Sequence, residues 1–390
     1  MKANTKQEFI PYGKQNISEA DIEAVVDVLR SDLITQGPVI PAFEQKIREY
    51  TGAAHASLVS SATAGLHLAC MAAGLGPGKT LLTSPNTFVA SSNAARYCGA
   101  DVDFVDIDPG TYNMSVPKLR EKLARLGEKV AVVMPVQFSG QSCPMEEIAA
   151  LKKEYGFRVI EDASHAIGGR YKNEPVGGCR YSDATVFSFH PVKIITTGEG
   201  GAVTTNDDEL GAQLARIRTH GVTRDQELMS EESHGPWYYQ QVELGYNYRI
   251  TDIQAALGLS QFARLDEFVS RRQQLADRYD ELLANLPVRT PVRHPDSYSS
   301  FHLYVIRVDR SRVSKPHKQI FEELRAAGIG VQLHYIPVHL QPYYRGLGFN
   351  EGDFPEVEAY YSEAVSLPLF YDLSDAQQDR VVVTLADVLS

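Results

Sequence analysis

From about residue 56 onward, short apolar runs alternate with longer stretches in which apolar residues recur three or four positions apart. The short runs have the length of strands, and the longer stretches have the spacing of helices. The predicted strands lie at 56–60, 80–84, 102–107, 130–136, 157–162, 184–189 and 201–205. The predicted helices lie at 63–75, 87–98, 116–126 and 146–155. This alternation predicts an α/β fold with a mostly parallel seven-stranded sheet flanked by helices on both faces.

The pattern changes after about residue 210, and this change predicts a second, smaller domain. A polar stretch at 223–239 predicts a loop that is mobile or contacts a partner, and the spacing at 252–269 predicts one long helix. A further strand is predicted at 301–308. Because 390 residues are more than one hydrophobic core usually serves, we expect two domains. The expected division is a large domain at 1–260 and a smaller α+β domain at 261–390.

The charge and composition argue against several classes of function. The net charge of −11 argues against a nucleic-acid-binding protein, because such a protein needs a basic face. No apolar run approaches the ~20 residues of a membrane span, and the first residues lack the apolar core of a signal peptide. The four cysteines are widely and irregularly spaced, as expected for reduced core thiols in a cytoplasmic protein.

One glycine-rich segment, G-L-G-P-G-K-T at 74–80, resembles a nucleotide-binding P-loop without matching it. The P-loop pattern needs a glycine where Ala73 stands, and it connects a strand to a helix, whereas here a predicted helix precedes a strand. We therefore interpret the segment as a helix stop.

Lys193 is the strongest candidate for a reactive residue. It lies in F-S-F-H-P-V-K-I-I-T-T-G-E-G-G (187–201), on an irregular connection between two predicted buried strands. An isolated lysine is usually a solvated surface cation, but apolar surroundings disfavour its charged form and lower its pKa from the reference ~10.4. The neutral amine is then a nucleophile toward a carbonyl, such as the aldehyde of pyridoxal 5′-phosphate.

Pyridoxal 5′-phosphate also needs a carboxylate beside its pyridine nitrogen, a cover for its ring and N–H donors for its phosphate. Asp162 ends the strand predicted at 157–162 and is the candidate carboxylate, and His165 follows three residues later. Taken alone, Asp162 is equally well explained as an ordinary cap, and His165 as a core histidine. Because ligands of such sheets bind at the carboxyl ends of strands, we expect the candidate residues to meet there.

The phosphate and the ring have further candidates. S-S-A-T-A-G-L at 60–66 opens a predicted helix directly after a strand, so its N–H groups can point at a phosphate. Ser188 is a hydroxyl in a predicted buried strand and needs a partner, which a phosphate oxygen would provide. Phe88 begins another predicted helix and is a candidate for stacking on the ring, although core packing is the ordinary role of a phenylalanine.

Together these segments resemble the DegT/DnrJ/EryC1 sugar aminotransferases, fold-type I enzymes that depend on pyridoxal phosphate. The segments that carry the resemblance span nearly the whole chain in order: L-I-T-Q-G-P (33–38), S-S-A-T-A-G-L-H-L-A (60–69), S-P-N-T-F-V-A-S (84–91), V-I-E-D-A-S-H-A-I-G (159–168), F-S-F-H-P-V-K-I-I-T-T-G-E-G-G (187–201), G-Y-N-Y-R-I-T-D-I-Q-A-A-L-G (245–258) and H-Y-I-P-V-H (334–339). The stretch 235–249 is similar to the pseudaminic-acid branch, which aminates a UDP-linked 4-keto-6-deoxy-N-acetyl sugar. One departure is S-A-T where S-G-T is frequent, but a helix start does not require glycine.

The resemblance implies a role for each matched residue. Lys193 would hold the cofactor covalently and then move a proton between the amino-bearing carbon and the cofactor. Related dehydratases carry histidine at this position, so the lysine favours transamination. Asp162 would pair with the pyridinium, His165 would lie near the ring hydroxyl, and Phe88 would stack on the ring. The phosphate would contact Ala62, Thr63 and Ser188, together with Asn247 of a second subunit, so the active unit would be a homodimer.

The resemblance also implies a substrate. The residues that fall in stretches lining the sugar-nucleotide site of the family are Thr35, Arg249, His334, Tyr335 and His339. We expect transfer of an amino group from glutamate to the C4 keto group of a UDP-linked 4-keto-6-deoxy-N-acetylhexosamine, with no nucleic acid or membrane as a partner. A dTDP- or GDP-linked 4-keto-6-deoxyhexose stays open as the substrate, because the base pocket is built from loops.

Two other classes of function are disfavoured. A non-catalytic regulator that binds the cofactor or a sugar nucleotide would not need the complete set of lysine, aspartate and phosphate-binding residues. A metal site at His334 and His339 is not expected, because their separation of five is not the i, i+4 spacing of a helical zinc pair.

Overall fold

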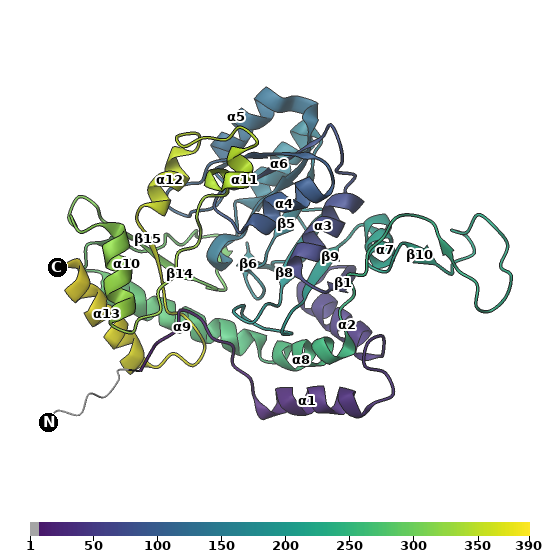
Figure 1. Ribbon diagram of the computed structural model, residues 1–390, viewed down its shortest axis with the longest axis horizontal. Coiled ribbons are helices and arrows are strands. Elements are labelled where there is room, and N and C mark those ends of the chain that lie inside the picture. Colours follow the sequence, from purple (N-terminus) through teal and green to yellow (C-terminus); the bar gives the residue numbers. More distant parts are fainter. Residues whose placement is uncertain (1–7) are drawn as a thin grey trace.

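A seven-stranded sheet forms the centre of the computed structural model, which describes residues 8–390 (Figure 1). The strand order is β1-β9-β8-β5-β4-β2-β3, and every pairing is parallel except those of β9, which runs antiparallel to both neighbours. The predicted mostly parallel sheet is therefore confirmed. The strand bounds are β1 (His55–Val59), β2 (Thr80–Thr83), β3 (Asp101–Phe104), β4 (Val130–Met134), β5 (Arg158–Asp162), β8 (Ala184–Ser188) and β9 (Gly201–Thr205).

Helices cover both faces of this sheet because successive strand residues point to opposite sides. In β2, Leu81 packs with the cluster under α3, α4 and α7, whereas Leu82 packs with the cluster under α5 and α6. On this second face, α2 and α8 cover the part of the sheet that contains β1 and β9. The helix bounds are α2 (Val39–Thr51), α3 (Ala62–Ala72), α4 (Val89–Tyr97), α5 (Val116–Leu126), α6 (Met145–Tyr155), α7 (Asp208–Ile217) and α8 (Asp252–Phe262).

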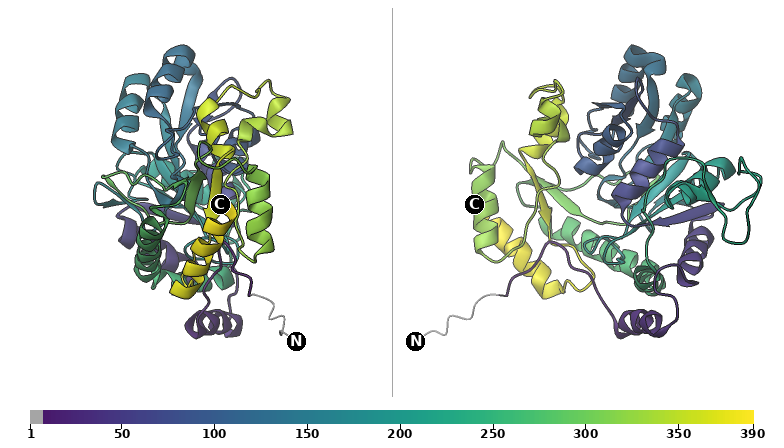
Figure 2. Two further views of the ribbon diagram at one scale, coloured as in Figure 1. Left: turned by 90° about the vertical axis from the view of Figure 1, so that its left-hand side faces the viewer. Right: turned by 45° about the vertical axis from the view of Figure 1, so that its right-hand side comes forward.

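The C-terminal part of the chain builds a second, smaller layer beside the large sheet (Figure 2). Its antiparallel sheet has the order β12-β14-β15 and packs against α9, α10 and α13. The bounds are α9 (Leu265–Leu283), β12 (Val288–Arg289), β14 (Tyr304–Val308), α10 (His317–Ala326), β15 (Ala364–Leu367) and α13 (Asp375–Leu389). The short helices α11 (Pro342–Arg345) and α12 (Pro355–Tyr361) instead pack against the core of the large sheet.

Two minor sheets complete the fold. A small antiparallel sheet joins β6 (Arg170–Tyr171), β7 (Glu174–Pro175) and β13 (Ser297–Tyr298). The polar stretch predicted to be a loop at 223–239 connects the two strands of a hairpin, β10 (Val222–Thr223) and β11 (Gln240–Gln241), and projects from the body of the molecule (Figure 1). Trp237 on this connection is highly exposed.

Helix α9 passes from one core to the other. Leu265 and Phe268 in its first turns belong to the cluster under the large sheet, whereas Tyr279 and Leu283 in its last turns belong to the cluster of the small sheet. The domain division at residues 260 and 261 stays a prediction, and α9 begins just after it.

The predicted single helix at 252–269 is wrong, because the chain breaks there into α8 and α9. Arg264, between them, leaves the helical conformation at φ −107° and ψ 11°. Its guanidinium donates hydrogen bonds to Asn16 and Asp21, which lie far away in sequence. The break is thus associated with tertiary contacts that no local pattern reveals. The strand predicted at 301–308 likewise begins only at Tyr304.

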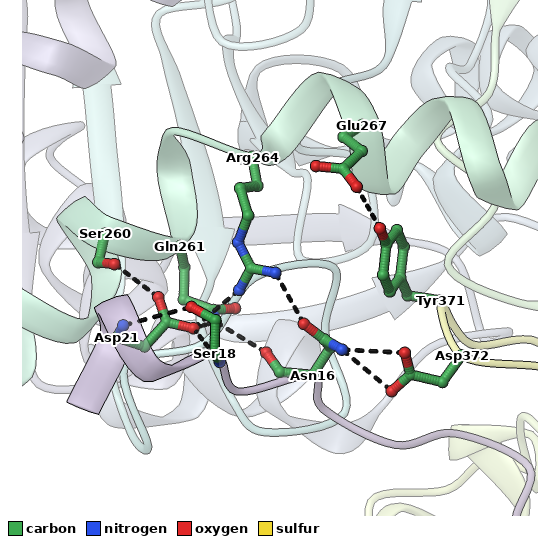
Figure 3. A network of polar contacts seen from close by, with 9 residues as sticks. All are labelled: Asn16, Ser18, Asp21, Ser260, Gln261, Arg264, Glu267, Tyr371 and Asp372. Carbon is green, nitrogen blue, oxygen red and sulfur yellow. Dashed lines mark hydrogen bonds and ion pairs between the residues drawn. The ribbon is translucent and has the colours of Figure 1, made fainter. Parts of the chain in front are cut away.

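The N-terminal segment fastens the two parts of the molecule together. Ile10 pairs with the backbone of Gly328 and Gly330 in the C-terminal part. Farther along, Asn16 donates to Asp372, and Asp21 at the start of α1 (Glu19–Arg30) accepts hydrogen bonds from α8 and from Arg264 (Figure 3). The segment therefore runs from the small sheet to the outer face of α8.

No helix within residues 8–390 is long and apolar enough to cross a membrane. The four cysteines are all free, and three of them are buried. In the same residues, no group of three or more histidine, cysteine or acidic side chains has the geometry to hold a metal ion.

Candidate active site

A cavity of about 570 Å³ opens at the carboxyl ends of the parallel strands. Residues at five strand ends line it, namely 60–63 after β1, 87–90 after β2, 136 after β4, 162–165 at the end of β5 and 188–193 at the end of β8. The C-terminal part contributes His302, His334 and Tyr335, and the N-terminal segment contributes Tyr12. The cavity therefore lies where the three parts of the chain meet, and its volume suits a cofactor with part of a substrate.

Lys193 lies on the irregular connection between β8 and β9, which is held by its own hydrogen bonds. The N–H of Lys193 donates to the carbonyl of His190 at 2.9 Å, and the N–H of Thr197 donates to the carbonyl of Phe189 at 3.0 Å. The hydroxyl of Thr196 donates to the same carbonyl of Phe189 at 3.0 Å. These bonds close a compact turn that places the lysine side chain on the cavity wall.

Burial lowers the pKa of Lys193 to about 8. Lys193 is half-buried, and the desolvation of its amine disfavours the charged form. The carboxylate of Asp162 acts in the opposite direction and raises the pKa, but it only partly offsets the desolvation. A substantial fraction of the amine is therefore neutral and nucleophilic near physiological pH.

Asp162 ends β5 and is buried beside the cavity. One carboxylate oxygen accepts a hydrogen bond from the hydroxyl of Ser91 at 2.6 Å. The other oxygen accepts from the hydroxyl of Ser164 at 2.6 Å and from its N–H at 3.1 Å. These neutral donors satisfy the carboxylate without cancelling its charge, so a cation in the cavity would meet a negative partner held in place.

His165 has one defined tautomer. Its Nδ1 accepts the N–H of Ser139 at 3.2 Å, so the proton of the neutral ring is on Nε2 and is donated to the hydroxyl of Tyr335 at 3.0 Å. Burial lowers the pKa of His165 well below its ordinary value, and the charge of Lys193 adds to this effect. The ring is therefore neutral, and it links the strand-end side of the cavity to the C-terminal part.

The start of α3 and the end of β8 face the cavity side by side. Ser61 caps α3 and accepts the N–H of Ala64 at 3.1 Å. The N–H groups of Ala62 and Thr63 lie in the first turn, before the helix can provide acceptors for them. Together with the hydroxyl of Ser188, they form a set of donors suited to an anion.

Phe88 caps the start of α4 and is 58% exposed although it lies on the cavity wall. Its ring is 6.3 Å from that of Tyr335, measured between centroids. An exposed aromatic ring on one wall of a cavity is suited to cover a flat ligand.

The structure does not bring every predicted substrate residue to this cavity. His334 and Tyr335 line it, whereas His339 is fully buried elsewhere, with Nε2 at 2.9 Å from Glu358 and its ring against Phe354. Thr35, Arg249 and Asn247 do not line it either. Thr35 and Asn247 are exposed, and Arg249 is partly exposed.

Sequence reasoning missed several residues of the site. Ser91 and Ser164 are close in sequence to predicted residues, and Ser164 stands two positions after Asp162, where a hydroxyl can reach back to the carboxylate. His302 had a weak signal, as a histidine entering an otherwise apolar run. Tyr12 had none, because tertiary pairing alone brings its segment to the cavity.

Comparison with known proteins identifies one family, whose match covers nearly the whole chain. The model of the DegT/DnrJ/EryC1/StrS aminotransferase family matches residues 15–386. The spore coat polysaccharide biosynthesis protein SpsC of Bacillus subtilis is 38% identical over 387 residues, which are 98% of each chain. The UDP-4-amino-4,6-dideoxy-N-acetyl-beta-L-altrosamine transaminase of Campylobacter jejuni is 36% identical over 382 residues, again 98% of each chain. The solved structure of Helicobacter pylori PseC, an aminotransferase involved in the biosynthesis of pseudoaminic acid, is 31% identical with a TM-score of 0.89, covering 98% of this chain and 99% of that one.

Proposed function

Because the chain belongs to the DegT/DnrJ/EryC1/StrS aminotransferase family, we propose that its cavity binds pyridoxal 5′-phosphate and aminates the C4 keto group of a UDP-linked 4-keto-6-deoxy-N-acetylhexosamine, with glutamate as the amino donor. Family membership makes the protein an enzyme of the pyridoxal-phosphate-dependent aminotransferase type, and its relatives include sugar aminotransferases. The cofactor contacts, the nucleotide, the sugar and the donor are parts of the proposal.

One observation carries the proposal. A lysine with a pKa of about 8 shares one cavity with a buried carboxylate whose hydrogen-bond donors are all neutral. Structural lysines either reach solvent or pair with an acid, and structural buried aspartates usually pair with a cation. The arrangement of Lys193 and Asp162 meets the needs of pyridoxal phosphate, which requires an amine for its aldehyde and a negative charge beside its ring nitrogen.

The donor set fits the rest of the cofactor. The first turn of α3 and Ser188 would hold the phosphate, Phe88 would cover the ring, and His165 would lie beside the ring hydroxyl. When bound, the cofactor supplies an electron sink that stabilises negative charge on the carbon bearing the amino group.

The protein's own side chains then have distinct tasks. Lys193 takes a proton from the carbon that carries the amino group and returns one to the former keto carbon, a role suited to a group that titrates near neutrality. With the cofactor bound, the carboxylate of Asp162 would be the negative partner that favours a proton on the ring nitrogen. The apolar and aromatic walls limit the access of water to the reacting carbon.

The names of two relatives support the choice of nucleotide sugar. The Campylobacter jejuni relative is a transaminase of a UDP-linked amino sugar, and PseC takes part in pseudoaminic acid biosynthesis. Side-by-side assays with glutamate and UDP-, dTDP- and GDP-linked 4-keto-6-deoxy sugars test the choice. A higher kcat/KM for the UDP-linked N-acetyl sugar is expected, and a preference for either other nucleotide would transfer the assignment to it.

A homodimer with shared sites belongs to the same proposal. Asn247 and Thr35 are exposed and lie outside the cavity of their own chain, so they are free to contact a second copy. In the proposed dimer, Asn247 reaches the phosphate held by the partner, and Thr35 and Arg249 contact the sugar nucleotide there. His334 and Tyr335 contact the substrate from the same chain.

Replacement of the lysine tests the chemistry directly. In Lys193→Ala we expect turnover to fall by at least about 10²–10⁴-fold, the usual contribution of a general acid–base residue, together with loss of the visible absorbance of the bound cofactor. Lys315→Ala is a matched control, because Lys315 forms an ion pair with Glu323 away from the cavity. Sustained multiple turnover by Lys193→Ala would contradict the assigned role.

A further inference from the structure

His302 occupies the cavity wall beside Lys193, and none of the roles above includes it. Its Nε2 lies 3.4 Å from Nζ of Lys193, and its ring packs against His165 with the centroids 4.4 Å apart. The side chain is only 4% exposed, and its Nδ1 has no hydrogen-bond partner within the part of the chain that the structure describes. A buried polar atom without a partner is uncommon and calls for an explanation.

The backbone at Phe301 and His302 has an unusual conformation that hydrogen bonds hold in place. Phe301 has a φ of 46°, in the left-handed region that a bulky residue rarely adopts. Arg272 of α9 is buried, and its Nη1 donates to the carbonyls of Phe301 at 3.1 Å and of His302 at 3.3 Å. An unfavourable backbone conformation that is held by a buried guanidinium is typical of a functional position.

The surroundings decide the state of the ring. Burial lowers the pKa of His302 well below its ordinary value, and Lys193, His165, Arg272 and His334 act in the same direction. The ring is therefore neutral, so one of its nitrogens is an acceptor. A lysine ammonium has three donors and no acceptor, so toward the charged form of Lys193 Nε2 accepts and the ring proton is on Nδ1.

We infer that His302 positions the free amine of Lys193 by accepting a hydrogen bond from it at Nε2, and thereby favours the protonated form of that amine. His302 is a positioning residue, since it acts only through Lys193. Desolvation disfavours the ammonium, whereas the charge of Asp162 and the hydrogen bond to His302 favour it. Nδ1 then carries the ring proton without a hydrogen-bond partner, because the tautomer that leaves Nε2 free to accept from the lysine places the proton on Nδ1.

The role of His302 in turnover rests on the proposed function, because in that function the amine of Lys193 is covalently attached to the cofactor in one state and free in another. In the free state, a fixed acceptor keeps the amine at the cavity wall and limits its rotation toward solvent. The hydrogen bond itself does not depend on the proposed reaction. The hydrogen bond from Lys193 to His302 and the proposed aminotransferase function can therefore be disproved by different measurements.

The pKa of Lys193 gives the decisive measurement. Full-length protein carrying lysine labelled with ¹³C at the ε carbon is loaded with pyridoxamine 5′-phosphate, which leaves Lys193 unbonded, and is titrated by NMR. Lys193→Ala identifies the resonance. In His302→Phe we expect the pKa of Lys193 to fall by about one unit, because a hydrogen bond to a charged group is lost. In His302→Gln, whose side-chain oxygen can accept, we expect most of that shift to be restored.

An unchanged pKa in folded His302→Phe would overturn the inference, as would a shift in His302→Gln as large as in the phenylalanine variant. The unaltered protein provides a second measurement, since ¹⁵N-labelled histidine reports which ring nitrogen carries the proton. A proton on Nδ1 of His302 is expected, and a proton on Nε2 would contradict the inference even if His302→Phe did not fold. Normal titrations combined with no transamination of any nucleotide sugar would instead overturn the proposed function.

Discussion

Lys193 shows how burial can change the proton affinity of an ordinary side chain. Desolvation and the nearby carboxylate of Asp162 act on its pKa in opposite directions, and desolvation is the larger effect. The carboxylate does not restore a normal pKa, because the loss of hydration on burial outweighs its attraction for the ammonium. The result is an amine that can both accept and release a proton near neutral pH.

The low pKa of Lys193 predicts how uptake of the cofactor depends on pH. Only the neutral amine attacks the aldehyde, and a folded-state pKa near 8 means that its fraction rises steeply between about pH 7 and pH 9. We expect the rate at which cofactor-free protein takes up pyridoxal 5′-phosphate to increase over this range and then level off. Stopped-flow absorbance measures this rate. A rate still rising between pH 9.5 and 10.5 would indicate an ordinary lysine.

A substitution that removes the charge of Asp162 but keeps the shape of the side chain is a second test. In Asp162→Asn, the side-chain oxygen can still accept from Ser164 and the new amide N–H can donate to the hydroxyl of Ser91, but the cavity loses its negative charge. We expect kcat to fall by about 10²–10³-fold, as on removal of one preorganised electrostatic partner, with a small change in melting temperature. Steady-state kinetics and thermal unfolding separate the two effects, and near-normal kcat would exclude the assigned role. Asp183→Asn, at a buried ion pair with Lys152 and Arg158 away from the cavity, should mainly reduce stability.

The sequence could predict which residues of the large sheet meet at the cavity, because each stands at or after the end of a strand that the apolar pattern marks. Lys193, Asp162 and Ser188 stand at or just after such strand ends, and the parallel sheet brings those ends together. His302 and Tyr12 could not be predicted in this way. They lie in segments that are placed by packing between distant parts of the chain. The spacing of apolar residues along the sequence does not reveal such packing.

At the scale of elements, local signals predicted most of the large sheet and failed where tertiary contacts decide the backbone. The helix expected at 116–126 and the strand expected at 201–205 have the predicted bounds, because their apolar spacing and end residues agree. The break between α8 and α9 has neither glycine nor proline to mark it. It coincides with Arg264, which bonds to the N-terminal segment, so its cause lies about 240 residues away in the sequence.

The buried carboxylate of Asp21 should stabilise this junction. It is fully buried and accepts hydrogen bonds from Ser260 at 2.6 Å, Gln261 at 2.6 Å and Arg264 at 2.8 Å. We expect Asp21→Ala to lower the free energy of unfolding by about 3–5 kcal/mol, because it removes one partner of a buried ion pair. Chemical denaturation measures the loss. Glu23→Ala, an exposed acid in the same helix, is the matched control and should change stability little.

The same carboxylate gives a pH dependence of stability. Burial alone would raise the pKa of Asp21, but hydrogen bonds from Ser18, Ser260 and Gln261 outweigh it and lower the pKa. A lowered folded-state pKa contributes stability above the unfolded value of ~3.9, and this contribution is lost as the pH falls through the folded value. The stability difference between the unaltered protein and Asp21→Asn should therefore be constant near neutrality and shrink below about pH 4. A difference that grew on acidification would contradict this sign.

At the scale of the whole molecule, the proposed dimer can be tested with two inactive variants. Lys193→Ala lacks the reactive amine, and Asn247→Ala would lack the group offered to the partner's cofactor. If sites are shared, a mixed dimer of the two variants contains one site with both residues intact. We expect activity to reappear when the subunits are exchanged, and each variant mixed with itself is the control. No recovery, with subunit exchange verified by mass, would place Asn247 outside the partner's site.

Helix α9 belongs to both hydrophobic cores, and the N-terminal segment spans the same boundary a second time. A hinge between the two parts would have to bend a continuous helix and detach that segment at once. Admission of a bulky nucleotide sugar must then depend on local rearrangement at the rim, where Phe88 and the neighbouring loops lie. We expect small-angle X-ray scattering to give nearly the same radius of gyration with and without the sugar nucleotide, so a competitor would meet a site whose shape changes only at this rim.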